Sequence, residues 1–188
     1  MSATEEPIAL RPPLTEAVVD GLKVGDRVLI SGTVYGARDA AHEKLVALVE
    51  GGNSVPFTLQ GAILYYVGPC PGRPGRPTLS AGPTTASRMD RYAPILMKHG
   101  LKGMIGKGIR SEPVIEAIQK YRAVYFGAIG GAGALLADRI RRCEPIAFQE
   151  LGPEALYLVE VEDFPAIVFN DVRGNDLHRT AIQTYKQG

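Results

Sequence analysis

The chain has 188 residues, 45% of them apolar and 22% charged, which fits one ordinary globular domain and excludes a largely disordered protein. The formal net charge of +1 argues against a nucleic-acid-binding protein, because contact with a phosphate backbone usually requires a basic excess. The sequence contains no run of about 18 apolar residues, so we expect no segment that spans a membrane.

Residues 1–24 are expected to form an N-terminal arm, followed by a single domain over residues 25–188. Pro7, Pro12 and Pro13 oppose a helix in the arm, which leaves at most a short capped turn in "LTEAVVDGL". An arm of this kind often wraps a neighbouring subunit. The segment lacks the charged and then apolar pattern of a signal peptide, so we expect a cytoplasmic protein.

The first half of the domain predicts two strands separated by a helix. "GDRVLISGTVYGA" has the alternation of a strand with one buried face, and "RDAAHEKLVALVEGG" has helical spacing with Gly51 as its stop. "AILYYVGP" suits a central strand. Residues 68–85 are then dominated by Pro and Gly, and long loops of this composition inside a domain tend to be functional.

The second half continues the alternation of helices and strands. We expect a helix from near Ser87 to His99, a strand and turn in "GMIGKG", and a helix in "SEPVIEAIQKY" with Ser111 as N-cap. "RAVYFGAIGGAGALLADRI" predicts a buried strand, a Gly-rich turn and a helix. Two β-rich segments and a polar tail after Asp171 follow. The fold class is therefore α/β, with a mixed sheet and flanking helices.

Arg38 stands where a predicted strand ends and a helix begins, a place where open α/β sheets hold their ligands. The alternative is a solvated arginine that pairs with Asp39 or Glu43. His42, on the same helix, reads as a packed or capping histidine, because no second histidine lies near it to complete a metal site.

In "GPTTASRMD", Thr84 and Thr85 present hydroxyls and backbone N–H groups at a helix start, a natural site for an anion. Arg88 lies one helical turn beyond Thr84, so the two can face the same point. The alternative is that Thr85 or Ser87 caps the helix while Arg88 and Asp90 are solvated.

Lys107 lies between two glycines after a predicted strand, where small neighbours let a substrate approach; the alternative is an exposed lysine in a glycine turn. "GAIGGAGA" lacks a clean GxGxxG pattern and favours a close-packing turn over a dinucleotide site. Three cations on three loops of a near-neutral protein indicate a small dianion such as a dicarboxylate. Cys70 and Cys143 have no partner at metal-ligand spacing, and no complete catalytic set is evident.

The segments "ARDAAH", "YYVGPCPGRPG", "SAGPTTASRMD" and "GLKGMIGKG" resemble, in order and spacing, the β region of the iron–sulfur hydro-lyases of the class I fumarase and L(+)-tartrate dehydratase family. The resemblance runs from about Leu22 to Asp176. It implies a swivelling β/β/α domain that closes over an α subunit. It also implies a [4Fe-4S] cluster on three cysteines of that α subunit and none on this chain, whose two cysteines cannot supply the pattern.

The resemblance also implies roles for individual residues in the reversible hydration of fumarate to (S)-malate. Arg38, Arg88 and Lys107, with Thr85, would bind the substrate carboxylates. Thr84 would be the catalytic base or, since a hydroxyl has a high pKa, would orient a water or relay a proton. The supporting residues would be Asp39 and Asp90, which fix neighbouring arginines, and His42 behind them.

Two other functions stay open at this point. The substrate could be L(+)-tartrate, whose two carboxylates would use the same cations. The chain could also be a stand-alone module that binds a small dicarboxylate, since no complete catalytic set is evident. For the assembly we expect α2β2 or contacts between β subunits, without nucleic acid or membrane.

Overall fold

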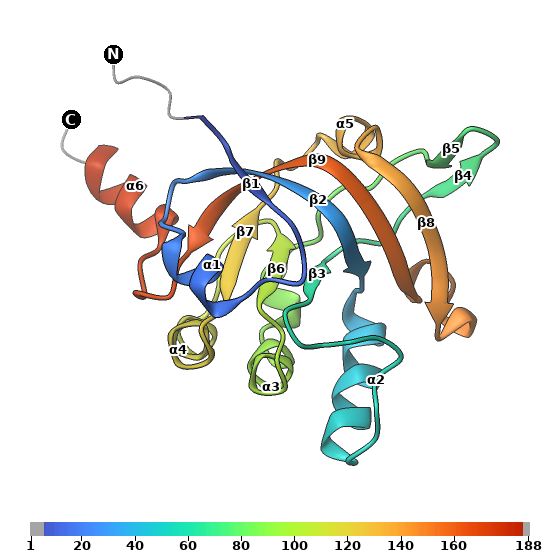
Figure 1. The fold of residues 1–188 in the computed structure, drawn as a ribbon, viewed down its shortest axis with the longest axis horizontal. Coiled ribbons are helices and arrows are strands. Elements are labelled where there is room, and N and C mark those ends of the chain that lie inside the picture. Colours follow the sequence, from blue (N-terminus) through green and yellow to red (C-terminus); the bar gives the residue numbers. More distant parts are fainter. Residues whose placement is uncertain (1–5, 186–188) are drawn as a thin grey trace.

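The computed structural model describes residues 6–185, and side chains as far as residue 181. Its centre is a seven-stranded mixed sheet (Figure 1). In spatial order the strands are β1 (Ile8–Leu10), β2 (Arg27–Gly36), β3 (Ile63–Tyr65), β6 (Gly103–Gly106), β7 (Val124–Gly127), β9 (Leu156–Asn170) and β8 (Ile140–Ala147).

The sheet closes on itself because β9 pairs with two strands. The run β2, β3, β6 and β7 is parallel, and β9 lies antiparallel to both β7 and β2. A register shift between Ile30 and Gly32 bends β2 where it follows β9, as bulges do at barrel corners. Five strands therefore form a barrel-like ring, which the α/β expectation did not include, whereas the mixed sheet and flanking helices are confirmed.

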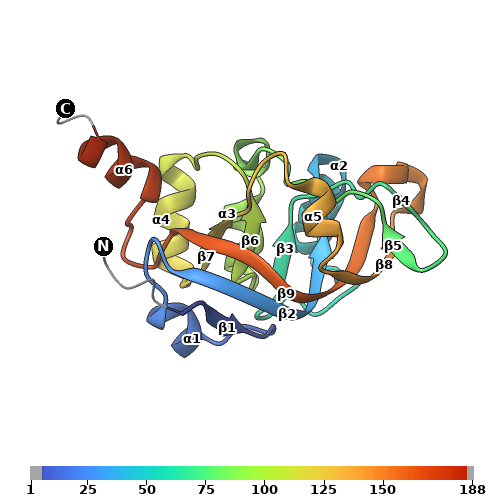
Figure 2. The ribbon, with the colours of Figure 1, turned by 90° about the horizontal axis from the view of Figure 1, so that it is seen from above.

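Both faces of the central strands are buried, which explains their continuous apolar sequence. Ile63 and Tyr65 of β3 point into the ring with Phe164 of β9, while Leu64 and Tyr66 pack under the helices. Those helices are α2 (Asp39–Glu50), α3 (Ala93–Lys98) and α4 (Glu112–Tyr121), which lie side by side on the outer face (Figures 1 and 2).

Residues 1–5 of the segment expected as an arm lie outside the described residues, and β1 pairs in parallel with β2 of its own chain. The short capped element is α1 (Glu16–Gly21), at whose start the Thr15 hydroxyl accepts a hydrogen bond from Val18 N at 3.3 Å. Leu10 and Val19 are buried in the barrel core. Contact of this segment with a neighbouring subunit stays a prediction.

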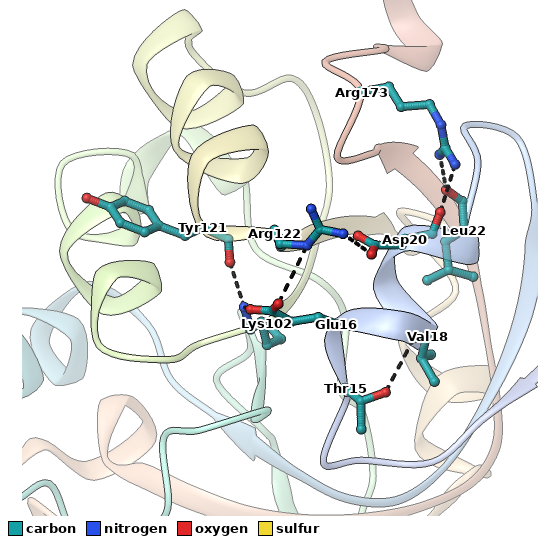
Figure 3. Close-up of polar contacts among 9 residues, drawn as sticks. All are labelled: Thr15, Glu16, Val18, Asp20, Leu22, Lys102, Tyr121, Arg122 and Arg173. Carbon is teal, nitrogen blue, oxygen red and sulfur yellow. Dashed lines mark hydrogen bonds and ion pairs between the residues drawn. The ribbon is translucent and has the colours of Figure 1, made fainter.

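Side chains at the amino end of β6 hold α1 in place (Figure 3). The buried Lys102 Nζ donates to Glu16 Oε1 at 3.0 Å and to the carbonyl of Tyr121 at 2.7 Å. Arg122 pairs with Asp20 of α1. The barrel end opposite to the loops described below is thus closed by α1.

Three local predictions were wrong or incomplete. The helix expected from Ser87 is a short 3-10 helix, η1 (Ala86–Met89), and α3 starts only at Ala93, because Pro94 fits the first turn of a helix but not its interior. The Pro/Gly loop contains a hairpin, β4 (Pro71–Arg73) and β5 (Arg76–Thr78). The polar tail contains α6 (Leu177–Tyr185).

The Gly-rich turn packs closely, as predicted. It leads into α5 (Gly133–Ala137), and the Gly133 carbonyl accepts a hydrogen bond from Ala81 N at 3.0 Å. A Cβ atom on Gly133 would lie 2.6 Å from the Ser80 hydroxyl and 3.1 Å from Gly82 N, so a side chain here would require Ser80 to move. Among the described residues, no helix combines the length and apolar character needed to cross a membrane.

Candidate functional site

The carboxyl ends of β2, β3, β6 and β7 lie at one edge of the sheet because the four strands are parallel. Open α/β sheets bind their ligands outside this edge. Arg38 follows β2, Thr84 and Thr85 lie in the long connection after β3, and Lys107 follows β6. The structure therefore brings four of the sequence-predicted residues to the same edge.

Thr84, Thr85 and Lys107 are held together by backbone hydrogen bonds. Thr84 N donates to the carbonyl of Tyr66 at 2.7 Å, and Lys107 N donates to the carbonyl of Thr84 at 3.1 Å. Ala86 N donates in turn to the Lys107 carbonyl at 2.8 Å, and Thr85 pairs with Lys107 as in a parallel bridge. The "GPTT" and "GKG" segments therefore form one rigid unit.

The side chains of this unit are accessible. Lys107 and Thr85 are exposed and Thr84 is half-buried. Lys107 forms no ion pair with any residue between 6 and 181, the range over which side chains are described. Thr85 stands at the N-cap of η1, but its hydroxyl makes no capping bond, which disagrees with the alternative that it serves only as a cap.

Asp39 lies between Arg38 and Arg88. Its Oδ1 accepts a hydrogen bond from Arg88 Nε at 2.9 Å, and its Oδ2 is 3.9 Å from Arg38 Nε. Arg88 uses only its Nε in this contact, so its two terminal nitrogens can still bind a carboxylate in a bidentate manner. One carboxylate thus orients both arginines and leaves donors available for a ligand.

Glu154, in the 3-10 helix η2 (Gln149–Glu154), supports Arg38 from the far side. Its Oε1 is 3.3 Å from Arg38 Nη2, and its Oε2 accepts a hydrogen bond from Ala40 N at 3.2 Å. The carboxylate therefore takes the place of an N-cap side chain for α2, which Arg38 itself does not provide. Sequence reasoning missed Glu154, because no local pattern links it to a helix that begins more than 100 residues earlier.

His42 is fully buried directly behind Arg38. Its Nδ1 donates to the Arg38 carbonyl at 2.9 Å, while its Nε2 has no partner among the described residues. Burial lowers the pKa of His42 from 6.5 to about 4, so the ring is neutral at pH 7. The ring also packs edge-on against Tyr66 at 5.2 Å between centroids. His42 therefore supports the backbone of Arg38 and does not face the ligand edge.

From the sequence, Asp90 is expected to fix a neighbouring arginine. In the structure Asp90 pairs instead with Arg110, 20 residues further along the chain. Its Oδ1 accepts a hydrogen bond from Arg110 Nε at 2.8 Å, and its Oδ2 accepts one from Ser111 N at the start of α4. Sequence reasoning also missed Arg110, which stands three residues after Lys107 and belongs to no motif that singles it out.

The residues of this chain do not fit an iron–sulfur cluster. Such clusters are held by several cysteine thiolates, whereas Cys70 is exposed before β4 and Cys143 lies on β8, where burial raises its pKa to about 11. Within the described part of the chain, no three His, Cys, Asp or Glu side chains are placed to hold a metal ion. We therefore derive no catalytic step through a group bound by this chain.

The comparisons with known proteins agree on one family. Residues 1–181 match the family model described as the fumarase C-terminus. The chain is 40% identical over 179 residues to the anaerobic class I fumarate hydratase of Escherichia coli K12, an alignment that covers 93% of this chain and 33% of the relative. It is 38% identical over 186 residues to fumarate hydratase 2 of Leishmania major, covering 97% of this chain and 33% of the relative.

A shorter relative matches along most of its length. The putative L(+)-tartrate dehydratase subunit beta of Methanocaldococcus jannaschii is 36% identical over 171 residues, which is 88% of this chain and 88% of that protein. The chain thus spans about a third of the two fumarate hydratases but corresponds in extent to the β subunit.

Proposed function

Because this chain belongs to the fumarase C-terminus family, we propose that it forms the substrate-binding half of a hydro-lyase that reversibly hydrates fumarate to (S)-malate. The observation that carries the proposal is the grouping of Arg38, Arg88 and Lys107 at the carboxyl ends of parallel strands. Fumarate carries two carboxylates, and guanidinium and ammonium groups are the side chains that bind them best.

The mechanism assigns binding to the cations and proton transfer to the threonine turn. Arg38 and Arg88, oriented by Asp39, and Lys107, fixed through its backbone to Thr84, would hold the two carboxylates, with Thr85 as a further contact. Holding the substrate fixes the carbon that gains or loses a proton relative to Thr84. Thr84 would then move that proton, directly or through a water that it orients.

We also propose a partner chain over this edge that carries a [4Fe-4S] cluster. Two observations support a partner: the chain spans about a third of the fumarate hydratases it matches, and its β-subunit relative is named as part of a larger assembly. In addition, Ile109, Ile129 and Leu135, in the segments that follow β6 and β7, are 60%, 69% and 71% exposed. Ile129 and Leu135 line a hollow of about 370 Å³.

A second candidate substrate is L(+)-tartrate. The observation that favours it is the match along 88% of a putative L(+)-tartrate dehydratase subunit beta. L(+)-tartrate also has two carboxylates, so the same three cations would bind it. Groups that sense its additional hydroxyl would then lie on the partner chain.

The test is to co-express this chain with a candidate partner that holds a cluster, and to purify the complex without oxygen. Fumarate absorbance is followed after malate is added, with each chain alone as a control, and L(+)-tartrate is assayed next. We expect turnover only in the mixture. A stable, cluster-loaded complex that acts on neither acid would contradict the proposal, and tight dicarboxylate binding by this chain alone would favour a binding module.

Two arginine variants sharpen the test because their side chains are equally exposed, 47% for Arg88 and 46% for Arg122. Arg88→Ala removes a carboxylate contact and should lower kcat/KM by about a hundredfold or more. Arg122 precedes the amino end of β7, where it pairs with Asp20 of α1 (Figure 3), so Arg122→Ala should leave kcat/KM unchanged. Equal losses in both variants would mean that Arg88 does not bind substrate.

A further inference from the structure

Arg110 is a buried cation to which the proposed mechanism gives no task. Its side chain has no exposed surface, although it lies only three residues after Lys107. Its Nε donates to Asp90 at 2.8 Å, and its Nη1 donates to the Tyr66 hydroxyl at 3.0 Å. Its guanidinium carbon also lies 5.0 Å from the centre of the Tyr125 ring. Burying a charge costs desolvation free energy, which here is offset by the ion pair with Asp90 and the hydrogen bond to Tyr66.

The partners of Arg110 belong to the segments that carry the site residues. Asp90 directly follows η1, which carries Arg88. The carbonyl of Tyr66 holds Thr84 N, so the hydroxyl and carbonyl of this one residue link Arg110 to the threonine turn. Tyr125, which packs against the guanidinium, donates its hydroxyl to the carbonyl of Gly108 at 3.0 Å. Arg110 thus connects the segments that hold Thr84, Arg88 and Lys107.

We propose that Arg110 is a positioning residue of the active site: it fixes the threonine turn, η1 and the Lys107 loop relative to one another through Tyr66 and Asp90. This inference rests on the proposed function, and it adds a residue that touches no substrate. Arg110 acts by holding two groups in fixed positions, because Nε and Nη1 of its planar guanidinium donate to Asp90 and to Tyr66 at the same time. The ammonium of a lysine at this position could not reproduce both contacts.

The charge of Arg110 is permanent, so its effect does not depend on pH. Burial alone would lower the pKa of Arg110, but the neighbouring Tyr66 and the Asp90 carboxylate outweigh it and leave the pKa above its ordinary value. Arginine is in any case not deprotonated in proteins. The consequence is a fixed ionic contact beneath the site.

A purely structural role must be separated from positioning, and Lys102 offers the matched control. It is also a buried cation, with a side chain 6% exposed against 0% for Arg110. It stands at the amino end of β6, where it contacts Glu16 and the carbonyl of Tyr121 (Figure 3), whereas Lys107 follows the carboxyl end of the same strand. Lys102→Met and Arg110→Met should therefore both lower the melting temperature, whereas only Arg110→Met should alter the arrangement of the site residues.

The first measurement is steady-state kinetics of the complex with fumarate. Loss of folded protein lowers the apparent kcat but leaves KM unchanged, because the surviving molecules are normal. We expect Arg110→Met to raise KM about tenfold or more and also to lower kcat, and Tyr66→Phe to show a smaller change of the same kind. Lys102→Met should leave KM unchanged. Equal KM values for wild type, Arg110→Met and Tyr66→Phe would overturn the proposal.

The second measurement is hydrogen exchange in this chain, which needs no activity. The amides of Lys107 and Ala86 form the bonds that join the two site segments, and they should exchange about tenfold faster in Arg110→Met and Tyr66→Phe but not in Lys102→Met. Unchanged exchange in both site variants overturns the inference. If the wild-type complex acts on neither fumarate nor L(+)-tartrate, the proposed function fails, while the exchange rates still decide whether Arg110 holds these segments.

Discussion

Thr84 and Thr85 are adjacent in the chain but occupy different environments. Thr84 is half-buried, with its N–H and carbonyl both bonded to neighbouring segments, whereas Thr85 is exposed. A group that moves a proton must be held rigidly, and a group that only contacts a carboxylate need not be. The backbone geometry therefore favours Thr84 for the first role and Thr85 for the second.

Replacement by valine tests this division, because valine keeps the shape of threonine and removes the hydroxyl. Under the proposed role, in which the Thr84 hydroxyl moves a proton in the transition state, Thr84→Val should lower kcat about 10²-fold to 10⁴-fold with little change in KM. Thr85→Val should mainly raise KM. Steady-state kinetics of the complex with fumarate measures both. A larger fall in kcat for Thr85→Val than for Thr84→Val would reverse the assignment.

His42 predicts a dependence of stability on pH. Burial lowers its pKa from 6.5 to about 4, so between these values the unfolded chain binds a proton that the folded chain does not. The stability contributed by the neutral ring is fully present above pH 6.5 and is lost as the pH falls to about 4. The loss is at most about 3 kcal/mol, at 1.36 kcal/mol per pKa unit.

Chemical denaturation at several pH values measures this contribution. We expect the free energy of unfolding of the wild type to fall from pH 6.5 towards about 4. His42→Asn, which keeps a donor for the Arg38 carbonyl but does not titrate, should show a much smaller slope, even if it is less stable overall. Parallel curves for the two proteins would show that His42 is not buried in its neutral form.

At the scale of elements, the strand ends approach one another because glycines leave room. A Cβ atom on Gly106, the last residue of β6, would lie 2.8 Å from Cδ2 of Tyr66 and 3.3 Å from the carbonyl oxygen of Thr84. The first distance is too short for two non-bonded carbon atoms and the second is tight, so a side chain here would displace the Tyr66 ring or the Lys107 loop. The glycine thus allows the close contact between these two segments.

Gly106→Ala should therefore lower the free energy of unfolding by about 1 to 3 kcal/mol, the usual cost of overpacking, and lower kcat/KM with it. Gly21→Ala is the matched control, because no atom lies within 4 Å of the position of its Cβ atom and the residue ends α1, remote from the site. It should be neutral or slightly stabilising. Denaturation and kinetics on both variants measure the difference, and equal behaviour would contradict the close packing at Gly106.

The elements that could be predicted were those with a strong local pattern. The alternation in β2 and the helical spacing with a terminal Gly51 in α2 both appear as expected. Where a local signal was weak, prediction failed: the pairing that makes β4 and β5 a hairpin depends on contacts across Gly72 and not on strand-forming residues. Propensity alone does not report such elements.

The candidate site was predictable only where chemistry is visible in one segment. Four charged or hydroxyl side chains each follow a predicted strand or stand near the start of a predicted helix, so their position in the chain already indicates a ligand site. They are Arg38, Thr84, Arg88 and Lys107. Arg110 and Glu154 act on residues that are remote in sequence, so their role depends on distances that only the fold supplies.

At the scale of the whole molecule, closure of the sheet separates two ends of different character. β9 spans 15 residues and pairs with β7, β2 and β8, and no periodicity in the sequence specifies three partners. Closure gathers the ends of four parallel strands into a ligand edge and leaves α1 at the other end (Figures 1 and 2). A swivelling motion of this unit against a partner stays a prediction.

Two exposed apolar side chains, Ile129 and Val18, provide a test of where a partner binds. Ile129 is 69% exposed in the loop after β7, next to Gly130, which packs near the Lys107 side chain. Val18, 40% exposed on α1, lies at the opposite end. If a partner covers the ligand edge, a charge at Ile129 must be buried without a counter-ion, whereas a charge at Val18 stays in water.

We therefore expect Ile129→Asp to weaken association with the proposed cluster-bearing partner by about tenfold or more, and Val18→Asp to leave it unchanged. Calorimetric titration of the purified chains measures both, with melting curves of each variant to verify folding. Because the proposed mechanism requires both chains, loss of association should also abolish turnover at concentrations where the wild-type complex is active. Undiminished association of Ile129→Asp together with weakened association of Val18→Asp would place the partner at the α1 end, and the substrate cations would then face solvent.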